Sequence, residues 1–329
     1  MKNPWKNKKV LVTGAGGFIG SHLAECLVTL GARTKALVHY HALGTPGWLN
    51  YSKHQRQMKI IAGDITDRDT LVEAMKGVET VFHLAALIAI PYSYQALGSY
   101  VRTNVQGTLN VLQVARRMGV RRVVHTSTSE VYGTAKYVPI DEAHPLQGQS
   151  PYAASKIGAD KMVEAFYYSF GLDCVVVRPF NTFGPRQSLR AIVPTIIMQC
   201  LTQKQLHLGN LYPTRDMNYV EDIVRGFLLA GALKKASGKV INLGGAHEIS
   251  IRDLVKLIGK LMDRKIVLRE EARRVRPLKS EVDRLVADST LAGDLLGWHP
   301  KISLQDGLKK TIAWFRKNNQ YYHAKNFAI

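Results

Sequence analysis

Two short stretches carry the residues best suited to acid–base chemistry, and the first is YAASK, from Tyr152 to Lys156. A spacing of four places the phenol and the ammonium on one face of a helix that begins there. A lysine charge beside a tyrosine lowers the pKa of the phenol, so Tyr152 could act as a base near neutral pH. The YxxxK pattern is common by chance, and it gains weight only from the motifs described next.

The second stretch is HTSTSEVYG, residues 125–133, in which four hydroxyl side chains precede a carboxylate. Thr128 and Glu130 are two residues apart, so they share a face if the segment is extended. A carboxylate in this position could act as a general base. The structural alternative is that Glu130 caps the following turn or pairs with a basic residue.

A glycine-rich turn, TGAGGFIG from Thr13 to Gly20, follows an expected strand and opens an expected helix. Gly14, Gly17 and Gly20 have GxxGxxG spacing. Glycines in this position let the backbone approach a pyrophosphate, whose charge the helix N-terminus stabilises. The turn therefore predicts a dinucleotide cofactor, and the alternative is a glycine-rich turn without a nucleotide.

The end of the second strand does not distinguish NAD from NADP. Dinucleotide folds usually place an acidic residue there to bind the ribose hydroxyls, but residues 36–43, ALVHYHAL, contain none. Arg33 and Lys35 could favour a 2′-phosphate or could face solvent. Asp64, after the third strand, could bind an adenine amino group or simply form a turn.

The order of the expected elements predicts an α/β fold of the Rossmann type, a doubly wound parallel sheet with a smaller α/β substrate-binding lobe. Near-continuous apolar runs suit strands that are buried on both faces. We expect strands at 9–14, 34–40, 58–64, 80–86, 122–128 and 174–180, and helices around 18–30, 68–76, 98–118 and 152–170. A strand–helix–strand stretch at about 215–243 is expected to return to the sheet. The dinucleotide-binding domain would then comprise 1–182 and about 215–247, and the nucleotide-sugar lobe about 183–214 and 248–329.

The formal net charge of +20 suits attraction of anionic small molecules, because the basic residues come in scattered pairs without a nucleic-acid-binding motif. The longest apolar stretch, residues 81–90, is half the length that a membrane-spanning helix needs. Cys26, Cys174 and Cys200 form no CxxC pattern, which argues against a disulfide framework and a zinc site. We therefore expect a cytoplasmic protein that starts at Met1 and has no metal, membrane or nucleic-acid partner.

Taken together, the motifs resemble those of the extended short-chain dehydrogenases/reductases, the nucleotide-sugar epimerase and dehydratase family. The similarity runs from TGAGGFIG through HLAA, YAASK, RPFNTFGPRQ and TRDMNYVED to RPLKSEVDRL, which is essentially the whole chain. It implies NAD or NADP as a tightly bound cofactor, with NAD favoured, and a homodimer in which the helices around 98–118 and 152–170 pair.

The resemblance also implies roles for individual residues. Thr128 and Tyr152 would contact the sugar O4, and Lys156 the nicotinamide ribose. The cofactor would contact Gly14, Gly17, Phe18, Ile19, Gly20, His39, Tyr40, Asp64, Ile65, Leu84, Ala85, Ala86, Asn104, Tyr152 and Lys156. The nucleotide sugar would contact Tyr92 and Ser93 of the PYSY loop, and Asn181, Arg186, Arg190, Arg215, Asn218 and Arg276. For each arginine, a surface ion pair is the alternative to a phosphate contact.

The reactions of this family differ in the step that follows formation of the 4-keto sugar, and that step depends on the residue at position 130. Epimerases of this family need no further base and usually have a neutral residue where Glu130 stands, whereas a 4,6-dehydratase needs a base at C5. Dehydratases acting on dTDP-glucose usually show Thr-Asp-Glu here and those acting on GDP-mannose show Thr-Ser-Glu, as this chain does at Thr128, Ser129 and Glu130. Glu130 would then also carry the C5 proton to O6, and Ser129 would orient the leaving hydroxyl.

Two other members of the family remain as alternatives. UDP-glucuronate decarboxylases share the STSEVYG segment, and some relatives are cofactor-sensing regulators, which typically lack the YxxxK pair. The wider segments LAALIAIPYSY and RPFNTFGPRQS are most similar to dehydratases of the legionaminic acid pathway, which act on a nucleotide-activated N-acetylglucosamine and serve surface glycan synthesis. The sequence therefore predicts a nucleotide-sugar 4,6-dehydratase, with a 4-epimerase or a decarboxylase as the alternatives.

Overall fold

Near-continuous runs of branched apolar residues form the strands of one seven-stranded sheet in a computed structural model that describes residues 3–40, 44–271 and 277–322. The strand order is β11-β6-β5-β4-β1-β2-β3, and every neighbouring pair is parallel. The strands are β1 Lys9–Thr13, β2 Arg33–His39, β3 Lys59–Gly63, β4 Thr80–His83, β5 Arg122–Thr126, β6 Cys174–Pro179 and β11 Val240–Leu243. This arrangement confirms the predicted doubly wound parallel sheet.

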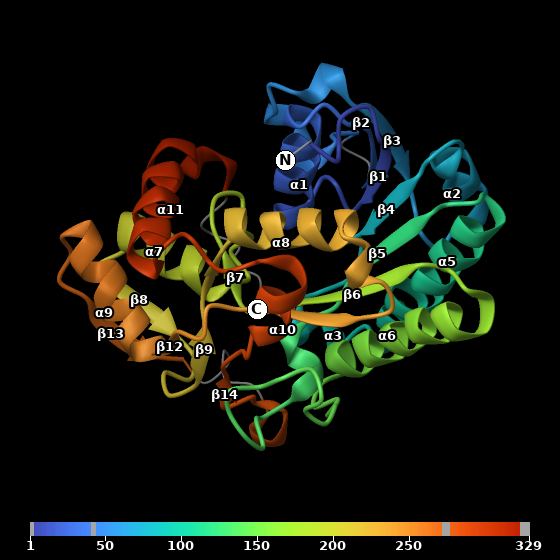
Figure 1. Ribbon diagram of the computed structural model, residues 1–329. Helices are drawn as coiled ribbons and strands as arrows, with labels where there is room; N and C mark the ends of the chain where they lie inside the picture. Colours follow the sequence, from blue (N-terminus) through green and yellow to red (C-terminus); the bar gives the residue numbers. More distant parts are fainter. Residues whose placement is uncertain (1–2, 41–43, 272–276, 323–329) are drawn as a thin grey trace.

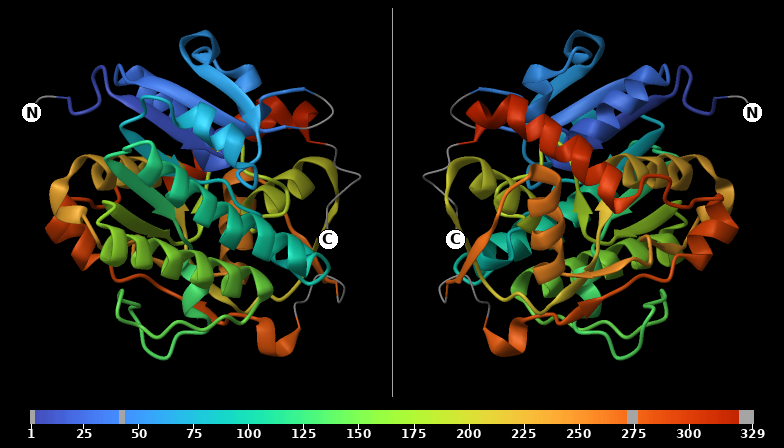
Figure 2. Two further views of the ribbon diagram at one scale, coloured as in Figure 1. Left: turned by 90° about the vertical axis from the view of Figure 1, so that its right-hand side faces the viewer. Right: turned by 90° about the vertical axis from the view of Figure 1, so that its left-hand side faces the viewer.

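Helices cover both faces of this sheet (Figure 1). One face packs against α1 Phe18–Thr29 and α8 Val220–Ala232, and the other against α2 Arg68–Met75, α5 Gly107–Arg117 and α6 Pro151–Phe170. The left view of Figure 2 looks onto α5 and α6, which lie side by side. Before α5, the chain forms α3 Ile90–Ser93, α4 Leu97–Tyr100 and a π-helical segment, η3 Val101–Gln106.

The smaller lobe lies beside the sheet and contains short strands and helices (Figure 1). Its helices are α7 Ile192–Thr202, α9 Ile251–Met262, α10 Thr290–Leu296 and α11 Leu304–Asn318. The remaining strands, β7 Thr182–Phe183, β8 Gln205–Leu208, β9 Thr214–Asp216, β10 Asn218–Tyr219, β12 Glu248–Ser250, β13 Val267–Glu270 and β14 Arg284–Leu285, form sheets of the orders β10-β7, β12-β9-β14 and β13-β8. Short 3-10 turns are η1 Gly47–Tyr51, η2 Gln55–Gln57, η4 Ser129–Tyr132, η5 Lys234–Ala236, η7 Leu278–Ser280 and η8 Asn319–Tyr321.

One expectation about the stretch at 215–243 is wrong. Of its strands, β11 joins the large sheet, whereas β9 pairs with β12 and β14, and β10 pairs with β7. Sequence periodicity identifies a strand but not its partner, because partner choice depends on contacts far along the chain. The domain boundaries drawn from the sequence stay a prediction.

A single hydrophobic cluster joins the sheet to the smaller lobe. It runs from Leu23 on α1 to Phe227 on α8 and on to Trp298 and Phe315. The fully buried Trp298 donates from Nε1 to the Asp222 carbonyl oxygen at 2.8 Å, and the Asp222 carboxylate accepts from two backbone N–H groups of residues 301 and 302. Helix α8 therefore holds the connection between α10 and α11.

A cluster of aromatic rings joins the C-terminal helix to the glycine-rich turn. The Trp48 ring lies 5.4 Å from Trp314 and 5.7 Å from Tyr322 between ring centroids. The backbone N–H of Trp48 donates to the Gly16 carbonyl oxygen at 3.0 Å. The segment after β2 is thus held against the turn after β1 by the far end of the chain.

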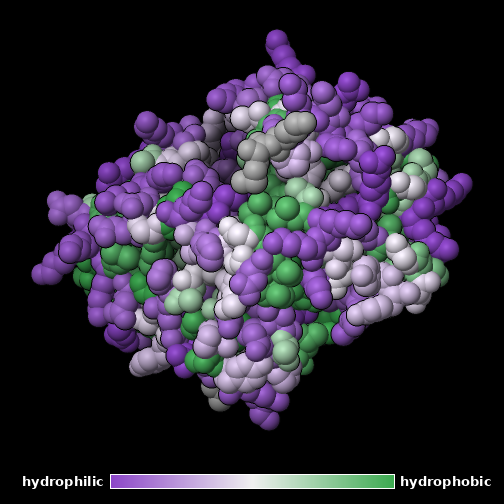
Figure 3. Space-filling model, viewed as in Figure 1, coloured by the Kyte–Doolittle hydropathy of each residue, from purple (hydrophilic) through white to green (hydrophobic). Residues whose placement is uncertain are grey.

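The surface is mainly polar. Most of the face that Figure 3 shows is hydrophilic, and hydrophobic residues gather near its middle. Across the part of the chain that the structure describes, no helix has the length and apolar character needed to cross a membrane.

Gly20 tests how closely the turn after β1 is packed. A Cβ there would lie 2.2 Å from the Gly14 carbonyl oxygen, so Gly20→Ala must displace backbone. We expect it to lower the free energy of unfolding by about 1–3 kcal/mol, measured by urea titration. Gly98→Ala is the control, because a Cβ at this helical position meets nothing within 4 Å. Equal stability of the two variants would contradict the packing described.

Candidate active site

Helix α6 brings Tyr152 and Lys156 to the carboxyl edge of the sheet. The helix begins there because Ser150 caps it, accepting from the Ala153 N–H at 3.1 Å, and because Pro151 occupies its first turn. Tyr152 therefore lies in the first turn and Lys156 one turn later, on the same face. Both are buried, with 7% and 3% of their surface exposed.

The Tyr152 phenol lies beside the HTSTSEVYG segment. Burial raises the pKa of Tyr152 well above its usual value, the hydrogen bond with Thr128 opposes this, and the nearby Glu130 charge adds to it. Loss of water around the phenol is the largest effect, so the net shift of the Tyr152 pKa is upward, and a lowering contribution from Lys156 stays a prediction. Thr128, Glu130 and Tyr152 nevertheless come together, as the motif spacing predicts.

Lys156 is held by the end of strand β5. Its Nζ donates to the Thr126 carbonyl oxygen at 2.7 Å. Burial lowers the pKa of Lys156 to about 8, although Asp160 favours the charged form. The ammonium is therefore charged at neutral pH but close to losing its proton.

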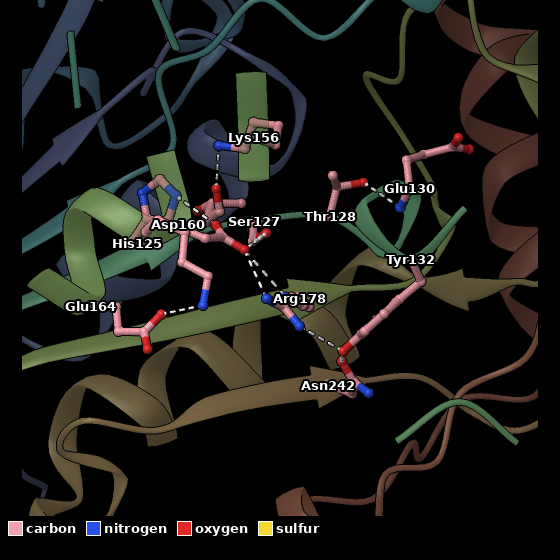
Figure 4. Close-up of polar contacts among 12 residues, drawn as sticks. His125, Ser127, Thr128, Glu130, Tyr132, Lys156, Asp160, Glu164, Arg178 and Asn242 are labelled. Carbon is pink, nitrogen blue, oxygen red and sulfur yellow. Dashed lines mark hydrogen bonds and ion pairs between the residues drawn. The ribbon is translucent and has the colours of Figure 1, made fainter. Parts of the chain in front are cut away.

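The segment after β5 is not extended, which corrects the expectation based on strand alternation. The Thr128 hydroxyl accepts from the Glu130 N–H at 3.2 Å and so caps the 3-10 turn η4. Ser129 is buried with 3% of its surface exposed, and Figure 4 shows the Glu130 side chain pointing away from Arg178 and Tyr132. A local side-chain cap has replaced the strand, and the turn rather than the strand places Glu130 near Tyr152.

The turn after β1 fits a dinucleotide pyrophosphate. Gly14 has φ +69°, and a Cβ there would lie 2.8 Å from the Ala85 backbone nitrogen, so the turn packs directly on the chain leaving β4. Gly17 is the N-cap of α1 and no side chain caps the helix, which leaves backbone N–H groups of its first turn for an anion. Phe18, Ile19 and Gly20 form that first turn, and Leu84, Ala85 and Ala86 lie half-buried beside it.

A buried histidine that the sequence analysis did not select organises this region. His83 Nδ1 lies 2.8 Å from Thr13 Oγ1, and its Nε2 lies 3.0 Å from Thr108 Oγ1. Thr108 donates its own proton to the Asn104 carbonyl oxygen at 2.6 Å, so it accepts from Nε2, and Nδ1 accepts from Thr13. Burial, with repulsion from His125 and Lys156, lowers the pKa of His83 well below its usual value. A histidine inside an apolar strand was the available signal.

Asn104 supports the cofactor region from within the protein. Its side chain exchanges two hydrogen bonds with the Leu87 backbone, at 2.8 and 2.9 Å, and donates to Ser155 Oγ at 2.9 Å. It thereby links the chain leaving β4 to α6. A direct cofactor contact of Asn104 stays a prediction.

The ends of β2 and β3 carry the residues expected near the adenosine. His39 Nε2 lies 3.4 Å from Asp64 Oδ2, and Asp64 Oδ1 accepts from the Thr66 N–H at 2.8 Å. Tyr40 is 71% exposed, Ile65 is buried, and His41 lies outside the described residues.

Arg33 and Lys35 do not contribute to this edge. They lie in the first half of β2, far along the strand from its carboxyl end, and the Lys35 ammonium donates to the carbonyl oxygens of Ala74 and Lys76. The suggestion that they favour a 2′-phosphate is therefore wrong.

Among the residues expected to bind the nucleotide sugar, Asn181 fits a ligand best. Its Oδ1 is buried and has no hydrogen-bond partner among the residues described, so a donor on a ligand would satisfy it. Arg215 is buried, donates to the Thr214 carbonyl oxygen at 2.9 Å and lies 3.6 Å from Glu281. Asn218 uses its amide to donate to Asp216.

The other predicted substrate residues are more scattered. Arg186 donates to Glu25 at 3.0 Å and to Ser21 at 3.2 Å, so it faces α1. Arg190 and Tyr92 are exposed. Ser93 has no exposed surface and donates to the Ile90 carbonyl oxygen at 2.6 Å, so its hydroxyl does not face the site. Arg276 lies outside the described residues.

A parallel sheet with a glycine-rich turn after β1 and a buried Tyr–Lys pair on α6 defines a short-chain dehydrogenase/reductase of the extended type, and comparisons with known proteins agree. Residues 11–311 match the family model described as GDP-mannose 4,6 dehydratase, so the chain belongs to this family of nucleotide-sugar dehydratases and epimerases. The predicted family is therefore confirmed.

Relatives with different reactions are equally similar. A dTDP-glucose 4,6-dehydratase of Actinoplanes sp. is 33% identical and covers 95% of this chain and 99% of its own. A UDP-glucose 4-epimerase of Mycolicibacterium smegmatis is also 33% identical, over 95% of this chain and 100% of its own. The crystal structure of a dTDP-glucose 4,6-dehydratase from Streptomyces venezuelae with NAD and TYD bound has a TM-score of 0.88 and 30% identity, covering 95% of this chain and 98% of its own.

Removing the buried ammonium tests the electrostatics of the site. The pKa of Lys156 is about 8 in the folded protein against 10.5 for an ordinary lysine, so its charge destabilises the fold below pH 8. We expect Lys156→Met to raise the free energy of unfolding by about 1–3 kcal/mol at pH 7. The gain should shrink between pH 8 and 10.5, as the wild-type lysine loses its proton. Denaturant titrations across this range measure it.

Lys161→Met is the control for this measurement. Lys161 is on the same helix, but its side chain is 58% exposed. Its substitution should change stability by less than about 0.5 kcal/mol at any pH. The lowered pKa of Lys156 would be contradicted if Lys156→Met were less stable than wild type at pH 7 and by the same amount at pH 10.

Proposed function

We propose that the protein is an NAD(P)-dependent nucleotide-sugar 4,6-dehydratase. The observation that carries the proposal is Glu130, a carboxylate near the Tyr152 phenol on the turn that Thr128 caps. Elimination across C5 and C6 needs a base beyond the tyrosine, whereas epimerisation at C4 does not. Sequence identity alone does not decide between the two reactions, because a dehydratase and an epimerase are both 33% identical to this chain.

The chain's own residues account for the proton transfers. When bound, NAD(P) accepts a hydride from sugar C4 and later returns one to C6. Thr128 holds the sugar O4, and Tyr152 in its phenolate form takes the O4 proton, which with loss of the C4 hydride gives a 4-keto sugar. The ketone acidifies the C5 proton, and Glu130 removes it and passes it to the C6 hydroxyl, which leaves as water. When hydride returns to C6, C5 takes up a proton from solvent. The sum of these steps is loss of one water, with no net oxidation.

The cofactor assignment rests on fit and on relatives. The uncapped N-terminus of α1 and the close glycine turn suit a pyrophosphate. The Streptomyces venezuelae dehydratase was crystallised with NAD. Lys156 and the backbone around Leu84 and Ala85 would hold the nicotinamide end. NAD is preferred over NADP because His39 pairs with Asp64, so no basic cluster forms at the end of β2 within the described residues.

The proposed substrate is a nucleotide-activated N-acetylglucosamine, which would become the 4-keto-6-deoxy sugar for surface glycans. The support is the similarity of the segments around residues 84–94 and 178–188 to dehydratases of the legionaminic acid pathway. Asn181 and Arg215 would bind the nucleotide diphosphate. A cytoplasmic homodimer that pairs through α5 and α6 belongs to the same proposal.

A product analysis separates the candidate reactions. UDP-, GDP- and CDP-N-acetylglucosamine would each be incubated with the enzyme in heavy water. A 4-keto-6-deoxy product that carries deuterium at C5 is expected. A 4-epimer without solvent deuterium would replace the dehydratase proposal by an epimerase, and loss of carbon dioxide from a UDP-glucuronate substrate would favour the decarboxylase.

Glu130→Gln isolates the elimination step. It removes the base but keeps the size of the side chain, so bound cofactor should still be reduced on adding substrate while water loss falls by about 10²–10⁴-fold. Absorbance of the reduced cofactor and product formation are followed together. Glu164→Gln, on the outer surface of α6, is the matched control and should keep full turnover. Unimpaired turnover of Glu130→Gln would show that Glu130 is not the base.

Tyr152→Phe isolates the first step. Without the phenol no group takes the O4 proton, so cofactor reduction itself should slow by about 10²–10⁴-fold. Tyr168→Phe removes a hydroxyl from the same helix at a position that is 74% exposed, and it should behave as wild type. Cofactor reduction at the wild-type rate in Tyr152→Phe would overturn the role of Tyr152.

A further inference from the structure

A chain of buried polar groups lies beneath the Tyr–Lys pair and takes no part in the proton transfers described above. Figure 4 shows it running from His125 and Asp160 through Arg178 to Tyr132 and Asn242. Asp160 is at its centre, on α6 one turn after Lys156, and only 3% of its surface is exposed. A carboxylate buried so deeply is costly unless it serves the groups around it.

The Asp160 carboxylate ties α6 to two strands. Its Oδ2 accepts from Ser127 Oγ at 2.7 Å and from Arg178 at 3.0 Å. Its Oδ1 lies 3.3 Å from Nε2 of the His125 ring, without hydrogen-bond alignment. Burial favours protonation, but the contacts with His125 and Arg178 outweigh it and lower the pKa of Asp160 to about 2. The carboxylate is therefore charged at any working pH.

Two successive side chains on one face of α6 contact two successive residues at the end of β5. Lys156 donates to the carbonyl oxygen of residue 126, and Asp160 accepts from the side chain of residue 127. Two successive turns of the helix thus hold two successive residues at the end of β5. The next residue is Thr128, which hydrogen-bonds Tyr152 and caps the turn that carries Glu130.

The groups around Lys156 leave Asp160 as its counter-charge. His83 on β4 and His125 on β5 both face the ammonium. Burial lowers the pKa of each histidine, and repulsion from Lys156 lowers it further; the pKa of His125 falls to about 4. Both histidines are therefore neutral at neutral pH. Within the described part of the chain, Asp160 on α6 is the group that favours the charged form of Lys156.

We propose that Asp160 is a positioning residue for the reaction: it fixes the end of β5 against α6 through Ser127 and supplies the negative charge that keeps Lys156 an ammonium beside Tyr152. The proposal rests on the proposed function only in taking Tyr152 and Lys156 as the catalytic pair. Arg178 completes the arrangement by holding the carboxylate from β6, and it is itself held by the Tyr132 hydroxyl at 2.9 Å.

The test measures Lys156 directly and needs no sugar substrate. The full chain is labelled with lysine carrying ¹³C at Cε, the Lys156 signal is assigned by its absence in Lys156→Met, and its pH titration is followed by NMR. The wild-type pKa should lie at about 8. In Asp160→Asn, which keeps an acceptor for Ser127 but removes the charge, it should fall by about one unit or more. A pKa unchanged in Asp160→Asn would overturn the proposal.

A second Arg–Asp pair in the same sheet, with a buried arginine and a half-buried aspartate, provides the control. Arg122 at the start of β5 donates to Asp173 at 2.8 and 2.9 Å, at the end of the sheet away from the site. Asp173→Asn should lower stability and leave the pKa of Lys156 unchanged. An equal shift in Asp173→Asn would show a general effect of destabilisation and would also overturn the proposal.

A variant that fails to fold is covered by a double substitution. Asp160→Asn leaves Arg178 buried without its partner, so Asp160→Asn with Arg178→Gln removes both charges. Its Lys156 pKa should still fall, because Asp160 is the charged group that raises the pKa of Lys156 against the effect of burial, and Arg178 is not among the groups that influence it. Since no sugar is present, a failure here is distinct from failure of the dehydratase proposal, which the product analysis decides.

Discussion

Burial of ionisable groups at the carboxyl edge of the parallel sheet is the constraint on which the rest of the site depends. Tyr152, Lys156, Asp160 and His125 all have less than 8% of their surface exposed. Loss of water is the largest influence on the pKa of each of them. Where water cannot screen charge, each group must be matched by a neighbour, so the order of strands and helices fixes the chemistry.

The fold supplies those neighbours from elements that are far apart in the chain. The sheet order sets β4, β5 and β6 side by side, so their buried polar residues meet below α6. His83 comes from β4, His125 from β5 and Arg178 from β6, while Lys156 and Asp160 come from the helix above. The two histidines are neutral at neutral pH, and the Asp160 carboxylate balances the charges of Lys156 and Arg178.

Much of the fold could be predicted from the sequence because it depends on local patterns. Apolar runs flanked by helical periodicity locate the strands and helices, and the spacing in Tyr152 and Lys156 places both on one face. Patterns of this kind do not show which side chain caps a turn. The hydroxyl of Thr128 ends the strand early, and strand alternation misses this because the competing hydrogen bond is a local side-chain effect.

Long-range pairing could not be predicted either. Arg186 resembles a phosphate ligand in its motif, yet Glu25, 161 positions earlier, holds it in this structure. In the sequence, His83 resembles an ordinary core residue and Asp160 an ordinary helix residue. Their neighbouring residues do not identify the groups on other elements that contact them in the folded protein. Partners of charged residues are set by topology, and only the assembled sheet reveals them.

The ambiguity among relatives has a physical origin in the same architecture. In the proposed mechanism, dehydratases and epimerases share oxidation at C4, which would use the glycine turn and the Tyr–Lys pair. Elimination requires one further base, and a single short turn after β5 can carry it. Proteins that differ in reaction therefore remain equally similar in sequence and fold. Overall identity therefore does not separate the two reactions, since a dehydratase and an epimerase are both 33% identical to this chain.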